Sequence, residues 1–415
     1  MKAFPVITSL FVIASASAAV DVKWVPEGLP PLPTTENIGL GHYLKPEQGK
    51  AVLDTALTRF PDRASWEAYG THVRQRIQEG AGLAPWPRRT PLNAVVRDRR
   101  IYDGYTVENV CFESVPGYLV TGNLYRPTDA KPPYAAMLST HGHGRPIVNA
   151  EDYNDHARFS PGMQARCATL ARMGAVVLSI DMFAYGDSIQ LFGQAAHKQP
   201  LAFKIQLWNA MRAVDFLLEQ DGVDPKRVGV SGESGGGTQS FMLTAFDPRI
   251  AVSVPVVMVS SYFFGGCACE SGLPTHRSAD HFVSNAMIAA LAAPRPMLVV
   301  SDGKDWTEHV PEIEFPFLKK IYGYYGAEQN VANVHLEKEG HDYGPSKRDA
   351  MYRFVAKPLG LSLAAVLTPE GKIDESRATI EKASALHVFT AEFPIPPDAL
   401  HDAAAIERTF SSLQN

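Results

Sequence analysis

The chain has 415 residues, of which 45% are hydrophobic and 20% charged, a composition typical of folded globular proteins and unlike that of disordered or fibrous ones. Its net charge of −5, with no block of lysine and arginine, argues against nucleic acid as the main ligand. A chain of this length can form one large core with appendages, or two modest cores.

Residues 1–19 predict an export signal. Lys2 supplies a positive start, Ala3–Ile13 an apolar run, and the small residues that follow a cleavage site. The apolar run is too short to span a bilayer, and no later segment is long and apolar enough to do so. We therefore expect a secreted or periplasmic protein without a membrane span.

Residues 20–90 predict an N-terminal arm followed by helices. Residues 21–48 are rich in proline and glycine, which favours an extended arm on the surface. In residues 49–80 the apolar side chains recur at helical spacing, and Pro61 and Asp62 are expected to divide them into two helices.

Residues 91–362 predict an α/β domain. It opens with two antiparallel strands around a turn at Pro116 and Gly117, and then alternates apolar strands with helices. This alternation predicts a mostly parallel sheet with helices on both faces, whose carboxyl-end loops carry the chemistry. Residues 363–415 lack the alternation and predict a C-terminal extension.

The stretch "RVGVSGESGGGTQSF" (227–241) places Ser234 in a G-x-S-x-G motif between a short strand and a helix. That context is the one a nucleophilic serine elbow requires, since it exposes the hydroxyl at the end of a strand. A phosphate-binding loop is excluded because no lysine follows the glycines. Ser234 is the predicted nucleophile.

A serine hydroxyl needs a neighbouring imidazole to take its proton, and the imidazole needs an acid to orient it. His341, in a loop after the last predicted strand, is the expected base. The acid is expected to be Asp305, after the strand "RPMLVV". Asp302 on the same loop and Glu270 after the preceding strand stay open as alternatives.

The oxyanion hole requires two N–H donors. We expect the amide of Gly235, next to the nucleophile, and the backbone amide of His143 in the loop "HGHG" (141–144). The two histidines of this loop, in an H-x-H spacing, could be metal ligands. A metal site would need further ligands close by, but Arg145 and Pro146 follow instead, so the pattern disfavours a metal.

Four cysteines are present, Cys111, Cys167, Cys267 and Cys269. One disulfide is plausible in an exported protein, although the sequence does not say which pair forms it. Cys267 and Cys269 lack the usual two-residue gap of a metal-binding pair. The prediction is therefore no metal and no cofactor.

Three further residues are candidate substrate contacts. Tyr185 and Trp306 lie in or near the predicted loops and offer aromatic surfaces that can stack on sugar rings. Glu233 precedes the nucleophile directly.

The motifs "STHGHG", "IDMFAYGDS", "GVSGESGGG", "VSDGKDWTEHVP" and "EGHDYG" together resemble the α/β-hydrolase superfamily over about residues 90–360. Within it, the chain is similar to the acetyl xylan esterase family, which includes cephalosporin-C deacetylases. This resemblance implies an α/β-hydrolase catalytic domain with Ser234, Asp305 and His341 as its triad. The chain departs from that family at Gly235, where glutamine is usual, and at Phe183–Gly186, where an Arg-Gly-Gln signature is replaced.

The predicted function is removal of acetyl groups from a plant-type polysaccharide by a secreted serine esterase. The first alternative is a methylesterase on uronic-acid methyl esters, of pectin or glucuronoyl type, although glucuronoyl enzymes carry an arginine after the nucleophile where this chain has Gly235. A peptidase or lipase on the same fold is a second alternative. A third is an inactive domain that only binds carbohydrate or a partner protein. The oligomeric state is not determined by the sequence.

Overall fold

The computed structural model describes residues 20–31, 40–272 and 275–415. The predicted export signal lies outside these residues. Within the described part of the chain, no helix has both the length and the apolar character needed to cross a membrane.

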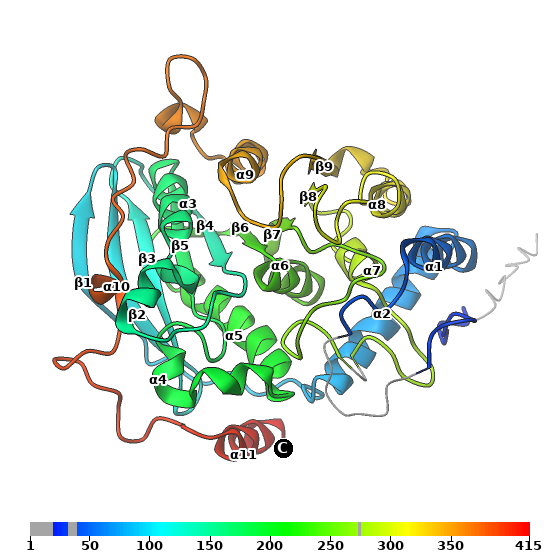
Figure 1. Ribbon diagram of the computed structural model, residues 1–415, viewed down its shortest axis with the longest axis horizontal. Helices are drawn as coiled ribbons and strands as arrows, with labels where there is room; N and C mark the ends of the chain where they lie inside the picture. The colour runs from blue at the N-terminus through cyan, green and yellow to red at the C-terminus, as the bar shows by residue number, and fades with distance from the viewer. Residues whose placement is uncertain (1–19, 32–39, 273–274) are drawn as a thin grey trace, which may run out of the picture.

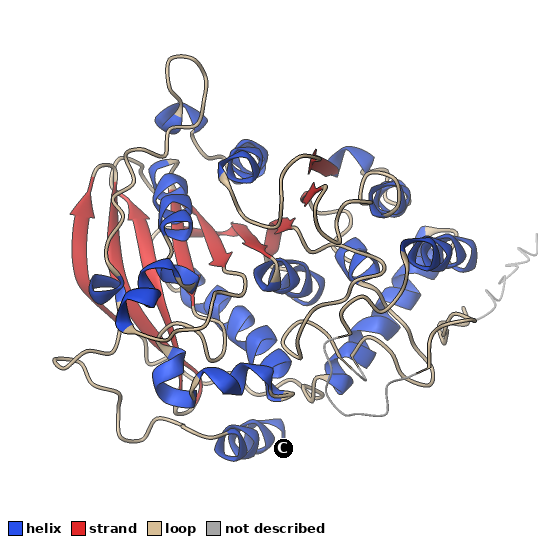
Figure 2. Ribbon diagram, in the orientation of Figure 1, coloured by secondary structure: helices blue, strands red, loops and turns tan. Residues whose placement is uncertain are grey.

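The core of the molecule is one nine-stranded sheet with the strand order β1-β2-β3-β5-β4-β6-β7-β8-β9 (Figures 1 and 2). Strands β4 to β9 run parallel to their neighbours, whereas β1, β2 and β3 are antiparallel, as is the junction of β3 with β5. The predicted α/β fold with a mostly parallel sheet is confirmed. The strands are β1 (Val95–Tyr102), β2 (Tyr105–Val115), β3 (Tyr118–Pro127), β4 (Tyr134–Thr140), β5 (Ala175–Ile180), β6 (Val223–Glu233), β7 (Ile250–Val256), β8 (Met297–Asp302) and β9 (Val331–Leu336).

The predicted antiparallel pair is β2 and β3, joined at Pro116 and Gly117, where Gly117 adopts a φ of 76°. The structure adds the edge strand β1, which the pattern analysis did not anticipate. Its sequence, "VVRDRRIY", is charged and mostly exposed, and Ile101 is 74% exposed. An edge strand of this kind carries little periodic signal, and its charges discourage pairing with other chains.

Helices cover both faces of the sheet and bury a separate hydrophobic core on each. The first core is formed with α5 (Leu201–Leu218), α6 (Gly235–Phe246), α7 (Asn285–Ala290) and α8 (Glu314–Gly323). The second is formed with α3 (Pro161–Arg172) and α9 (Pro345–Leu359). Because β4, β5, β7 and β8 are buried on both faces, their sequences are near-continuous apolar runs, and this pattern predicted them as strands.

The N-terminal segment forms the two expected helices, α1 (Pro46–Arg59) and α2 (Arg63–Gly80), separated at Pro61 and Asp62. Asp62 caps α2 by accepting a hydrogen bond from the amide of Ser65 at 2.9 Å. The helices extend the first core rather than forming one of their own, since Tyr69 is fully buried and its hydroxyl donates to the carbonyl of Phe282.

The C-terminal segment crosses the molecule as an extended chain with the short helix α10 (Ala383–Leu386) and ends in α11 (Ala403–Gln414) (Figure 1). It packs beside the N-terminal segment, because the amide of Arg88 donates to the carbonyl of Leu413 at 2.9 Å. Upstream, His387 contacts the buried carboxylate of Asp187, which follows β5 and precedes the short helix α4 (Ser188–Phe192). Both terminal segments therefore contribute to the packing around the sheet.

Candidate active site

Ser234 lies at the sharp turn between β6 and α6. Its φ of 54° and ψ of −121° lie in a region that L-residues rarely occupy, at a cost of about 1–3 kcal/mol. The turn is possible because Gly232 and Gly236 have no side chains: a Cβ on Gly232 would lie 2.1 Å from Thr140 Oγ1. The Ser234 amide also donates to the carbonyl of Val256 at 3.0 Å. The strand, turn and helix predicted around Ser234 are all present.

His341 and Asp305 meet in loops that follow neighbouring strands of the sheet. Nδ1 of His341 lies 2.6 Å from Oδ2 of Asp305. The other oxygen of Asp305 accepts from the amide and the hydroxyl of Thr307, each at 2.6 Å. The Asp305 side chain is only 3% exposed, whereas that of His341 is 34% exposed. The structure therefore brings the expected base and acid together, with the acid fixed and the base open to solvent.

Asp302, one of the two alternative acids, is paired elsewhere. Its carboxylate is fully buried and lies 3.1 Å from the ammonium of Lys347, which is buried as well. The same ammonium donates to the carbonyl of Gly340 and to Asp342 on either side of His341. Asp302 thus anchors the loop that carries His341 without touching the imidazole.

Glu270, the other alternative acid, is buried behind the loop of residues 141–144, called the histidine–glycine loop below. One of its oxygens accepts from the amide of Gly266 at 2.7 Å, and the other lies 3.6 Å from Nδ1 of His143. Burial raises the pKa of its carboxyl to about 7. Among the described residues, the carboxylate hydrogen-bonded to His341 is that of Asp305.

Ser234 and His341 open into one pocket of about 250 Å³, which is also lined by His143, Glu233 and Tyr343. Its rim carries further polar groups, from Asp155, Ser160 and Asp342. The pocket lies at the carboxyl ends of the parallel strands, where ligands bind in open α/β sheets.

In the histidine–glycine loop after β4, the amide of one residue is bound by a side chain and that of the next is not. The amide of Gly142 is already bound, because it donates to Oε1 of Glu233 at 3.0 Å. The buried His141 fixes the start of the loop, since its Nε2 accepts from the amide of Met182. In the described chain, the amide of His143 has no acceptor, and that of Gly235 is an unpaired N–H at the first position of α6. These are the two amides that the sequence analysis expected as oxyanion donors, and that role stays a prediction.

Sequence reasoning missed the group that fixes this arrangement, the buried Arg166 of α3. Its guanidinium donates to Oε2 of Glu233 at 2.9 Å, to Ser139 Oγ and to the carbonyl of Thr140, and it lies over the ring of Tyr343. Both oxygens of Glu233 are therefore bound by protein groups. An arginine on an otherwise apolar helix face is the only sign of this contact in the sequence.

Replacing Glu233 with glutamine is expected to lower the free energy of unfolding by about 2–3 kcal/mol, because the nearly buried guanidinium of Arg166 loses its counter-charge. The histidine–glycine loop loses its fixed contact at the same time, so kcat should fall about tenfold or more with little change in KM. Chemical denaturation and steady-state kinetics measure the two effects.

The matched control for that substitution is Asp349→Asn, which breaks the exposed ion pair of Asp349 with Arg353. It should change stability by less than about 0.5 kcal/mol. Equal effects of the two substitutions would contradict a structural role for Glu233.

The two aromatic candidates for sugar contact lie in different surroundings. Trp306 is partly exposed, stacks on Phe263 with ring centroids 3.8 Å apart, and lies 4.5 Å from the ring of His341. Tyr185 is enclosed by histidine rings, stacked on His156 and edge-on to His197. Trp306 therefore lies nearer the predicted base, while Tyr185 packs behind the histidine–glycine loop.

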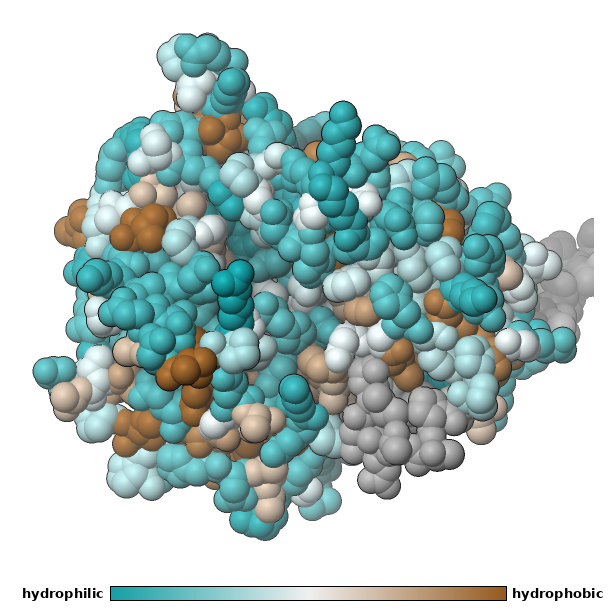
Figure 3. Space-filling view, in the orientation of Figure 1, coloured by the Kyte–Doolittle hydropathy of each residue, from teal (hydrophilic) through white to brown (hydrophobic). Residues whose placement is uncertain are grey.

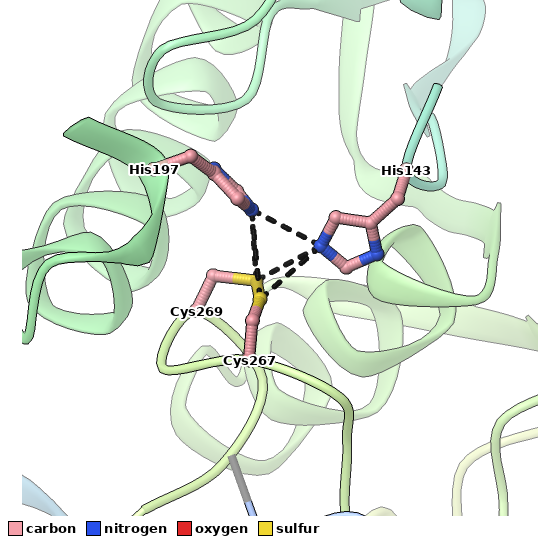
Figure 4. A group of neighbouring side chains, drawn as sticks. All are labelled: His143, His197, Cys267 and Cys269. Atoms are coloured by element: carbon pink, nitrogen blue, oxygen red, sulfur yellow. Dashed lines mark hydrogen bonds between the residues drawn. A yellow bond between two sulfur atoms is a disulfide. The ribbon is translucent and has the colours of Figure 1, made fainter. Parts of the chain in front are cut away.

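Behind this loop the structure gathers four residues: His143, Cys267 and Cys269, which the sequence analysis judged separately, and His197, which it did not single out. Nε2 of His143 and of His197 lie 3.0 Å apart, and both contact the sulfurs of Cys267 and Cys269, which form a disulfide (Figure 4). Burial lowers the pKa of both imidazoles to about 4, which keeps them neutral at neutral pH. The remaining cysteines, Cys111 and Cys167, are buried and free. This cluster is the one group of described residues with the composition and proximity of a metal site.

Comparison with known proteins places this geometry in a family. A solved structure, methylesterase BT1017, is 38% identical in sequence and superposes with a TM-score of 0.79, covering 90% of this chain and 82% of that one. The chain belongs to the α/β-hydrolase carbohydrate esterases. The resemblance expected from the motifs is confirmed at this level.

Other carbohydrate esterases match more distantly. The family model for fungal glucuronyl esterases matches residues 185–269. A 4-O-methyl-glucuronoyl methylesterase of Neurospora crassa is 25% identical over 211 residues, covering 43% of this chain and 52% of that protein. A structure of a putative acetyl xylan esterase from Bacteroides fragilis is 18% identical with a TM-score of 0.51, covering 67% of this chain and 77% of that one, and shows the shared fold alone.

Proposed function

We propose that this carbohydrate esterase hydrolyses methyl esters of uronic-acid residues in a polysaccharide, with Ser234, His341 and Asp305 as its catalytic triad. The observation that carries the mechanism is the 2.6 Å contact between His341 Nδ1 and Asp305 Oδ2, in loops that open onto the same pocket as the strained Ser234 turn.

The geometry supports an acyl-enzyme mechanism. Asp305 accepts a hydrogen bond from the Nδ1–H of His341, which leaves the lone pair of Nε2 as the base. Oγ of Ser234 loses its proton to Nε2 as it attacks the ester carbonyl. The tetrahedral intermediate collapses when the imidazolium returns that proton to the leaving methanol, which leaves the uronoyl group on Ser234. Water activated by His341 then releases the uronic acid and restores the serine.

The free amides of Gly235 and His143 are the donors for the oxyanion of both tetrahedral intermediates. Donors that are fixed before the reaction stabilise the developing charge without reorganisation. The contacts of Glu233 with Gly142 and Arg166 hold one of the two donor loops in place.

The relatives favour the methylesterase alternative over removal of acetyl groups. Two of the similar proteins are named as methylesterases, one of them acting on a 4-O-methyl-glucuronoyl ester. In a uronate methyl ester the sugar itself is the acyl group, so a ring must fit directly beside Ser234. A pocket of about 250 Å³ with a polar rim is close to the lower end of the ~300–1,000 Å³ range of small-molecule pockets, which suits one sugar residue with the polymer continuing outside.

The hydropathy of the protein surface is consistent with a hydrated substrate such as a polysaccharide. The face seen in Figure 3 is mostly hydrophilic, with apolar residues in small separate groups. A broad exposed apolar patch would mark a lipid or protein contact instead. Export, predicted from residues 1–19, remains part of this proposal and would bring the enzyme to polysaccharides outside the cytoplasm.

The test is to incubate the purified chain with methyl-esterified pectin, with a methyl glucuronate ester and with acetylated xylan, and to quantify methanol and acetate. We expect methanol from the uronate esters, no release by Ser234→Ala, and little acetate. Acetate as the main product would replace the methyl-ester proposal with the deacetylase prediction while keeping the triad. Methanol released equally by both proteins would overturn Ser234 as the nucleophile.

A further inference from the structure

We propose that His143, His197, Cys267 and Cys269 form a tetrahedral zinc site, of which the Cys267–Cys269 disulfide is the oxidised, metal-free form. The site lies beside the proposed active centre and has a different chemistry from it. Its proposed role is structural: to fix the loop that supplies one oxyanion donor.

The four ligands come from three separate parts of the chain. His143 belongs to the loop after β4, His197 to a short helical turn (Gln194–Lys198), and the two cysteines to the segment after β7. Their ligand atoms all lie within 4.8 Å of one another. Figure 4 shows both imidazoles pointing at the sulfur pair. Two nitrogens and two sulfurs in one cluster are the donor set that Zn²⁺ prefers in closed sites.

The imidazoles are oriented as those of zinc-binding histidines are. Nδ1 of His197 lies 2.6 Å from the carbonyl of Phe183, so Nδ1 carries the proton and Nε2 presents its lone pair to the cluster. Nδ1 of His143 lies 3.6 Å from the carboxylate of Glu270, and its Nε2 faces the cluster as well. A carbonyl or carboxylate behind each ligating histidine is a usual feature of zinc sites.

Without a metal, the cluster has too few protons for its contacts. Nε2 of His197 is an acceptor, and the sulfurs of a disulfide carry no hydrogen. The only donor left is an N–H on Nε2 of His143. It would have to serve three acceptors that lie 3.0–3.3 Å away, Nε2 of His197 and the sulfurs of Cys267 and Cys269. Nε2 of His197 and the sulfur of Cys269 are also 3.0 Å apart with no proton between them. A cation at the centre would use all four lone pairs at once.

The two forms are related by reduction. An external reductant supplies two electrons to the S–S bond and two thiols result: a thiol reductant also gives two protons and becomes a disulfide, whereas a phosphine takes the oxygen of a water molecule, whose two protons go to the sulfurs. Zn²⁺ then displaces both thiol protons and forms two Zn–S and two Zn–N bonds. With four protein ligands the ion has no open position, so it does not activate water.

The site lies directly behind the proposed oxyanion hole. A Cβ on Gly235 would lie 3.0 Å from Cε1 of the His143 ring, so this ring packs against the residue that carries the other oxyanion donor. Fixing the His143 side chain therefore fixes its backbone amide relative to Gly235. His197 and the cysteines have no place in the proposed triad and serve only through this contact.

The experiment uses the untagged full chain, reduced with a water-soluble phosphine, loaded with zinc sulfate without oxygen, and passed through a desalting column. We expect about one zinc ion per chain by atomic emission spectroscopy. The oxidised protein, His197→Ala and Cys269→Ser should retain about a tenth of that or less. Cys167→Ser, a buried free cysteine outside the cluster, is the matched control and should bind zinc like the unmodified chain.

Two measurements on the unmodified chain avoid any dependence on variant folding. Cobalt in place of zinc should give intense visible bands of tetrahedral geometry and a thiolate-to-cobalt charge-transfer band. Zinc should also protect two reactive thiols from alkylation, since Cys111 and Cys167 are buried, with burial raising the pKa of each to about 11. A reduced chain that retains no zinc, or cobalt bound without the thiolate band, would overturn the proposal.

Discussion

Replacing Ser234 with alanine should lower kcat for the ester substrate by about 10⁵- to 10⁶-fold, because the other serine that lines the pocket, Ser160, caps α3 and does not lie at the strand-to-helix turn. The backbone turn remains, since Gly232 and Gly236 are unchanged and the residue 234 amide still donates to the carbonyl of Val256. Binding of substrate should therefore persist. Single-turnover kinetics, together with binding of an uncleaved oligosaccharide by calorimetry, measure the two quantities.

The control for that substitution is Ser412→Ala on the exposed face of α11, a helix that contributes no residue to the lining of the pocket. It should keep full activity. Activity of Ser234→Ala within tenfold of the unmodified chain would show that the reaction does not pass through Ser234, and would leave the pocket as a binding site only.

Replacing Asp305 with asparagine is expected to lower kcat by about 10³- to 10⁴-fold with a small effect on stability. The asparagine amide is nearly the same size, and Thr307 can still donate to its oxygen. Without the carboxylate, however, His341 loses the acceptor that selects its Nδ1 tautomer and stabilises its protonated form. Steady-state kinetics and thermal denaturation of the same preparation distinguish these effects.

Replacement of the neighbouring carboxylate, Asp302, is expected to lower stability more than kcat. Asp302→Asn leaves the buried ammonium of Lys347 without its buried partner, and the free energy of unfolding should fall by about 3–5 kcal/mol. The kcat of the protein that remains folded should fall much less than in Asp305→Asn. A third variant, Glu270→Gln, tests the other alternative acid. A loss of kcat in either variant as large as that of Asp305→Asn would contradict the proposed triad.

Local sequence was sufficient for the mostly parallel sheet and for Ser234 and His341 as the candidate nucleophile and base. Apolar runs buried on both faces of a parallel sheet, such as β5 and β7, are visible without coordinates. A serine between a strand and a helix can only sit at a strand end, and His341 follows the last strand in the order that the fold requires. These features depend on residues that are adjacent in the chain, which is why pattern analysis found them.

Local sequence patterns do not reveal contacts between residues that are distant in the chain. Asp302 and Asp305 are three positions apart, and only the tertiary structure separates the partner of Lys347 from the partner of His341. The same holds for the contact of Arg166 with Glu233, which are 67 positions apart. Such pairs depend on where loops from different strands meet, and the periodicity of a local sequence does not predict those meeting points.

The cluster behind the histidine–glycine loop shows the difference most clearly. The sequence offered an H-x-H pair, a lone His197 and a closely spaced cysteine pair, and none of these alone has the spacing of a metal site. By itself, then, the sequence determined the α/β fold, the strand ends that carry the chemistry, and the residue types at those ends. Only the tertiary structure decided which of those residues share a hydrogen bond or a cluster, because parallel strands bring together loops that are far apart in the chain, such as those of His143 and Cys269, which are 126 positions apart.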